Sequence, residues 1–66
     1  MVELGLSKKW IDKMVSFPES GMGYQKVEVK LKSGVRLKGI VMNSDILKVD
    51  GHTIFGNEDI EDIKIL

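Results

Sequence analysis

The apolar residues near the start of the chain recur at helical spacing. Residues three and four positions apart share one stripe of a helix, and this spacing relates Leu6, Trp10, Ile11, Met14 and Val15. We therefore predict a helix over residues 6–16, with Ser7 as its N-cap. Pro18 ends it, because proline disfavours helical geometry at the residue before it. A helix this short is marginal alone, so its stripe must pack on the rest of the domain or on a second chain.

From residue 26 onward the spacing of apolar residues changes to two, which is typical of strands with one buried face. A two-residue turn after the first strand would place apolar residues opposite charged ones. A loop over residues 32–34 instead keeps the apolar residues of both strands on one face and pairs Leu31 with Val35. Gly34 then takes the left-handed position that this class of loop favours.

The register of this hairpin also decides which charges face each other. Glu28 lies opposite Lys38, which is attractive, whereas Lys30 lies opposite Arg36, which is repulsive. We expect an anion near these positive charges: either the acidic C-terminal segment of this or a neighbouring chain, or an external polyanion. The candidate anion-facing patch consists of Lys30, Lys32, Arg36 and Lys38.

The third predicted strand, Ile46 to Val49, is expected to continue into another tight hairpin. Asp-Gly at positions 50–51 is a strong signal for a two-residue turn. This turn would pair Val49 with His52 and Leu47 with Ile54. His52 is the only imidazole in the chain and would be a partly buried edge residue there. It is also the only candidate base for a nucleophile, and its neighbours suggest no such role.

Other signals complete the strand pattern. Gly39 interrupts the alternation, and a glycine inside a strand often marks a bulge or bend. Residues 43–45 form a turn, Asn57 caps a single helical turn, and a last strand follows from Ile60 to Leu66. The fold class that we predict is mainly β: a small, half-open, five-stranded antiparallel barrel with an N-terminal α-helix and a one-turn helix before the last strand. Its architecture is similar to SH3-like and Sm-like barrels.

A chain of 66 residues makes one domain, 1–66. Within it we predict the helix at 6–16, a connector loop at 17–25 and the β-barrel at 26–66. The chain has no cysteine and one histidine, so a structural zinc site is implausible. No apolar run approaches the length of a membrane span. We expect no cofactor, no metal, no membrane partner and a cytoplasmic location.

The charges are distributed in two opposite blocks, although the formal net charge is zero. Residues 24–49 carry six basic and two acidic side chains, whereas residues 50–66 carry five acidic and one basic. We expect the two blocks to neutralise each other within the fold, with an anionic partner as the alternative. The last acidic groups lack the spacing of a calcium loop; they are Glu58, Asp59, Glu61 and Asp62.

The connector has an unusual composition. It runs Pro18, Glu19, Ser20, Gly21, Met22, Gly23 and Tyr24 before Gln25. This segment resembles the signature of small uncharacterised bacterial proteins in which it precedes a strand-rich domain with an acidic, isoleucine-rich tail. The resemblance covers roughly residues 17–65 and implies a shape without an activity. The segment is either a rigid connector or a contact loop in which Met22 and Tyr24 bind a peptide or a second copy of the chain.

Taken together, these residues favour a non-catalytic binding or interaction module that contacts a protein or a second copy of itself. The alternative is an Sm-like RNA-binding protein that uses the basic hairpin. Nucleic acid is disfavoured, because none of the aromatic residues alternates with the basic ones and stacking on bases needs such residues. An enzyme is the least expected reading for a chain with this inventory.

Overall fold

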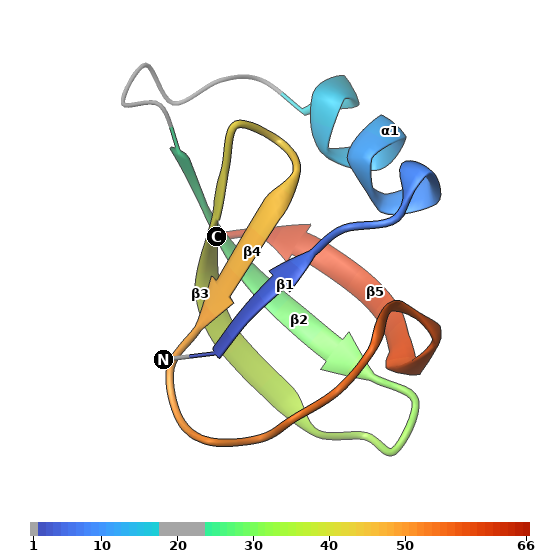
Figure 1. Ribbon diagram of the computed structural model, residues 1–66, viewed down its shortest axis with the longest axis vertical. Coiled ribbons are helices and arrows are strands. Elements are labelled where there is room, and N and C mark those ends of the chain that lie inside the picture. Colours follow the sequence, from blue (N-terminus) through green and yellow to red (C-terminus); the bar gives the residue numbers. More distant parts are fainter. Residues whose placement is uncertain (1, 18–23) are drawn as a thin grey trace.

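The computed structural model describes residues 2–17 and 24–66, in which five strands and two helical elements follow one another (Figure 1). In chain order they are β1 (Val2–Gly5), α1 (Lys8–Ser16), β2 (Tyr24–Leu31), β3 (Arg36–Met42), β4 (Ile46–Val49), the 3-10 turn η1 (Asn57–Asp59) and β5 (Ile60–Ile65). The mainly β class, the N-terminal helix and the helical turn before the last strand are confirmed.

The five strands form one antiparallel sheet in the order β1-β4-β3-β2-β5. Figure 1 shows the sheet strongly curled, with α1 beside β5. The two outermost strands do not pair with each other in the described part of the chain, so the sheet is not closed into the predicted barrel. The side chain of Asn57, which lies just before β5, forms hydrogen bonds with the backbone at the end of β1.

The hairpin of β2 and β3 has the predicted register. Glu28 lies opposite Lys38, and the Leu31 N–H donates to the Val35 carbonyl oxygen at 2.8 Å. Gly34 has a φ of 96°, the left-handed conformation that the loop requires. Keeping the apolar residues on one face was therefore sufficient to fix this register.

The strand beside β4 is not the predicted one. Val2 pairs with Val49 and Leu4 pairs with Leu47, so the N-terminal β1 takes the place expected for the segment after the Asp-Gly turn. Residues 51–54 are exposed and belong to no strand. The predicted number of five strands agrees with the structure only because two errors cancel. The strand predicted after the Asp-Gly turn is absent, and β1 was not predicted.

Gly39 marks a close approach of two backbones and not a bulge. It pairs with Val27 on one side and Val49 on the other, and both ladders keep their register there. A Cβ atom at this position would lie 2.1 Å from the Lys48 carbonyl oxygen. The only register shift involving β2 falls between Lys30 and Leu31, where that strand pairs with β5.

Two further turns differ in how well they match the prediction. Asn43 and Ser44 both have positive φ angles, which confirms a tight turn at this point. The prediction that Asn57 caps the helical turn is wrong: Gly56 is the N-cap of η1, and its N–H donates to the Asp59 carboxylate at 2.8 Å. The side chain of Asn57 is thus available for another partner.

One hydrophobic core lies inside the curl of the sheet. It consists of Leu6, Trp10, Met14, Val27, Val29, Leu31, Val41, Leu47, Val49, Phe55, Ile60 and Ile63. The helix contributes Trp10 and Met14, which confirms that its stripe packs on the sheet of the same chain. Val15 was predicted to share that stripe but is 66 % exposed. The helix therefore closes the core with one narrow face.

Candidate functional site

The predicted contact loop lies mostly outside the described residues, which exclude 18–23. Its last residue, Tyr24, begins β2 and is half-buried, and the following Gln25 is buried within the same strand. The predicted connector therefore ends two residues earlier than expected. The two alternatives for this segment, a rigid connector and a binding loop, both stay predictions.

The candidate anion-facing patch lies next to the acidic C-terminal strand. On the outer face, Lys30 stands between Arg36 on β3 and Asp62 on β5, and its Nζ is 3.3 Å from Glu61 Oε2. In the neighbouring row, Glu28 stands between two lysines, Lys38 of β3 and Lys64 of β5. The repulsion between Lys30 and Arg36 is thus offset by acidic groups of the same chain.

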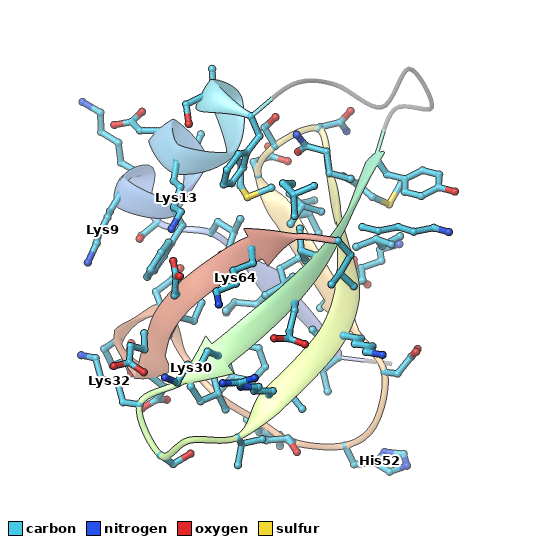
Figure 2. All side chains as sticks on the ribbon, turned by 180° about the vertical axis from the view of Figure 1, so that it is seen from behind. Lys9, Lys13, Lys30, Lys32, His52 and Lys64 are labelled. Carbon is cyan, nitrogen blue, oxygen red and sulfur yellow. The ribbon has the colours of Figure 1, made fainter. Side chains whose placement is uncertain are left out.

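The helix adds two lysines to this side of the molecule (Figure 2). Lys13 forms an ion pair with Asp62, and the ammonium groups of Lys9 and Lys13 lie 4.9 and 5.8 Å from the centre of the Trp10 ring. Cation–π attraction favours such placement. The hydrogen bond from Lys13 is the main reason why the pKa of Asp62 lies below its usual value, with the Ile63 N–H as a further donor to the same carboxylate.

The depressed pKa of Asp62 predicts how stability depends on pH. Because the folded-state pKa is lowered, the ion pair contributes stability above the unfolded-state pKa and loses it as pH falls through the folded-state pKa. The Asp62→Asn variant lacks this contribution. We expect its deficit in unfolding free energy to be constant from about pH 7 to 5 and to shrink below about pH 4. Denaturant titrations at several pH values measure this.

Lys13→Met is the matched control and should reduce the same acid sensitivity. Wild-type and Asp62→Asn stability curves that stay parallel at low pH would contradict the assignment of the ion pair.

The sheet also contains a strand-accepting edge that the sequence analysis missed. We define it as the side of β4 that faces β1, together with the side chain of Asn57. The Leu6 N–H donates to the Asp45 carbonyl oxygen at 2.8 Å and continues the β1–β4 register. Hydrogen-bonded pairs recur at every second residue of an antiparallel ladder, so Asp45, Leu47 and Val49 offer their backbone groups to the incoming strand.

Asn57 holds the end of that incoming strand. Its Nδ2 donates to the Gly5 carbonyl oxygen at 3.0 Å, and its Oδ1 accepts the Ser7 N–H at 2.8 Å. Both partners are backbone groups, so the side chain recognises an extended backbone rather than a particular side chain. The Trp10 ring N–H donates to the backbone carbonyl oxygen of the same asparagine at 3.4 Å. Asn57 thereby links β1, α1 and the start of β5.

The strand on this edge shows which side chains the edge accepts. Val2 and Leu4 are half-buried and pack against the core from one face. Glu3, on the other face, has its Oε1 3.9 Å from Lys48 Nζ. The only signal for this strand in the sequence is the apolar–acidic–apolar alternation Val-Glu-Leu, which is too short to predict a strand by itself.

The structure corrects the expectation about His52. His52 is exposed and unpaired in the sheet, so its predicted place opposite Val49 at a partly buried edge is wrong. Figure 2 shows it far from the lysines of the helix face. No group of three or more metal-binding side chains occurs among the described residues. Across the same residues, none of the helices has the length and apolar character that crossing a membrane requires.

Comparisons of the chain with protein-family models, curated proteins and solved structures found no match. No relative therefore supplies an activity or a set of site residues. The resemblance over residues 17–65 stays a prediction, and the functional argument rests on the geometry of the strand-accepting edge.

Proposed function

We propose that this chain is a non-catalytic interaction module that binds an extended protein segment along the strand-accepting edge. The observation that carries the proposal is the pair of hydrogen bonds in which the Asn57 side chain donates to the Gly5 carbonyl oxygen and accepts from the Ser7 N–H. A side-chain amide that donates to one backbone carbonyl oxygen and accepts from the N–H two residues later can bind an extended backbone of any sequence. Strand addition to a sheet edge is a common mode of peptide recognition, with main-chain hydrogen bonds for affinity and alternate side chains for specificity.

The segment now on the edge defines the partner. It places apolar side chains two positions apart on the core and an acidic side chain between them, opposite Lys48. A partner segment should therefore read apolar–acidic–apolar. In this reading β1 is an intramolecular ligand, and an external segment must compete with it. Because only molecules with an open edge can bind, the apparent Kd of the external segment equals its intrinsic Kd divided by the fraction of such molecules.

A labelled peptide with the sequence of residues 2–7 tests the proposal by fluorescence anisotropy. We expect weak binding to the full-length chain, and tighter binding to a Leu4→Ala variant whose own strand is weakened. Leu4 is half-buried, and shortening a buried leucine fully to alanine costs about 2–5 kcal/mol. A smaller loss at this site still predicts a gain in apparent affinity of about tenfold.

Two controls make the result specific. A peptide with aspartate in place of its leucine should not bind, because a charge would replace the apolar contact on the core. Light scattering on the same samples shows whether the occupant is instead the N-terminal strand of a second copy, which would appear as a dimer that the peptide dissociates. The proposal is wrong if the Leu4→Ala variant stays folded and monomeric and binds the peptide no better than the wild type does.

RNA binding is a second candidate, because Lys9 and Lys13 extend the basic patch across the helix. Acidic neighbours offset this patch: Asp62 is paired with Lys13 and Glu61 with Lys30. Single-stranded RNA that binds at about 50 mM salt and is released at about 200 mM would favour this candidate. We also propose that residues 26–66 are related in architecture to SH3-like and Sm-like folds and that the protein is cytoplasmic.

A further inference from the structure

Two segments of this chain match the same edge of β4. Residues 2–5 occupy it as β1. Residues 52–55 follow an Asp-Gly pair that favours a two-residue hairpin, and such a hairpin would pair His52 with Val49 and Ile54 with Leu47. We infer that β1 and residues 52–55 are alternative partners of β4, so that withdrawal of β1 lets the second segment fold back onto the vacated edge. This inference goes beyond the proposed function, because it concerns a single chain and holds whether or not another chain binds.

Both pairings would use the backbone groups of the same residues of β4. In the present ladder Leu47 and Val49 direct their backbone groups toward β1, because the Leu6–Asp45 hydrogen bond continues the register at every second residue. In a hairpin with a two-residue loop, the residues that flank the loop form a hydrogen-bonded pair. The flanking residue here is Val49, so the alternative hairpin uses the backbone groups that β1 uses now. A phase shift of one residue would have excluded it.

The free segment is also prepared for this pairing. Gly51 already has a φ of 98°, one of the two positive φ angles that a type I′ turn requires, and Asp50 would have to adopt the other. Ile54 is 89 % exposed, more than any other large apolar side chain among the described residues. Opposite Leu47 it would take the place of Leu4 on the core face. The alternative pairing therefore buries a side chain that the present structure leaves in water.

Other contacts explain why β1 holds the edge in the present structure. Phe55 is 8 % exposed and would turn to the outer face opposite Ile46 in the alternative hairpin. The two hydrogen bonds between the Asn57 side chain and the backbone at the end of β1 would also be lost. The burial of Phe55 and the hydrogen bonds of Asn57 thus favour the β1 state, in addition to the packing of Val2 and Leu4 on the core.

Engineered disulfides in the full-length chain distinguish the two pairings, since the protein has no cysteine of its own. Lys48→Cys with Thr53→Cys places the thiols directly opposite each other in the alternative hairpin only. Lys48→Cys with His52→Cys is the matched control, because it closes a shorter loop but puts the side chains on opposite faces. At low protein concentration in a glutathione buffer, we expect the 48–53 disulfide to be favoured at least about fivefold over the 48–52 disulfide.

Weakening β1 should raise the yield of the 48–53 disulfide further. We expect Leu4→Ala to increase its equilibrium constant about fivefold or more, because the competing strand is destabilised. Asn57→Ala should act in the same direction, and it keeps the test decisive if the first variant does not fold. Equal yields of the 48–52 and 48–53 disulfides, or a 48–53 yield that neither variant changes, would overturn the inference. A peptide that binds the edge should suppress the 48–53 disulfide, but failure to bind peptide leaves this result unaffected.

Discussion

Replacing Gly39 by alanine should lower the free energy of unfolding by roughly 3 kcal/mol or more, the upper part of the range for an added methyl in a packed site. The new Cβ would lie 2.1 Å from the Lys48 carbonyl oxygen and 2.8 Å from a methyl carbon of Val49. The first of these atoms belongs to the backbone, so the clash is relieved only if β3 and β4 separate. That separation would strain the ladder on which β1 also depends.

Gly5→Ala is the matched control for this experiment. Gly5 also lies in a strand, but no atom lies within 4 Å of a Cβ built there. Chemical denaturation followed by circular dichroism should show Gly5→Ala within about 1 kcal/mol of the wild type, on the stabilising side if the backbone effect dominates. A Gly39→Ala variant with wild-type stability would mean that the close approach of the two strands relaxes without cost.

Replacing Trp10 by alanine should cost about 3–5 kcal/mol, the range for removing a buried aromatic side chain. Trp10 is 4 % exposed and closes the open end of the core, and its ring N–H donates to the backbone of Asn57. A domain of this size buries a modest share of its surface, so such a loss removes most of its stability. Circular dichroism is the suitable probe, because the variant lacks the only tryptophan.

Val15 on the same helix provides the control. It is 66 % exposed, and Val15→Ala should change the unfolding free energy by no more than about 0.5 kcal/mol. Similar melting curves for Trp10→Ala and Val15→Ala would show that the helix does not contribute to the stability of the sheet.

The sequence predicted those parts of the fold that local patterns determine. The register of β2 and β3 follows from alternation over eight and seven residues and from Gly34, all within one hairpin. The helix follows from its apolar stripe. The predicted partner of β4 was wrong, because residues 2–5 and residues 52–55 both match its edge. Only long-range contacts decide between these two segments. The burial of Phe55 and the hydrogen bonds of Asn57 favour β1, and neither contact has a signal in local sequence.

The candidate site was predictable to a smaller extent. The basic patch was found because its charges alternate within a strand, and its acidic neighbours follow from pairing β5 with β2. The role of Asn57 could not be predicted, since an asparagine before an acidic pair is typical of a helix cap. Its partners, Gly5 and Ser7, lie 52 and 50 residues away in the sequence.

That long separation has a consequence for how the chain folds. The strand β1 pairs with β4 and is held by Asn57, so during synthesis it has no partner until those later residues have emerged from the ribosome. Loops that join such distant segments carry a large entropic cost, and folds dominated by them form slowly. During synthesis, Val2 and Leu4 remain exposed while the hairpin of β2 and β3 can already form. We therefore expect β1 to dock late and to be accessible until then to a chaperone or to another nascent chain.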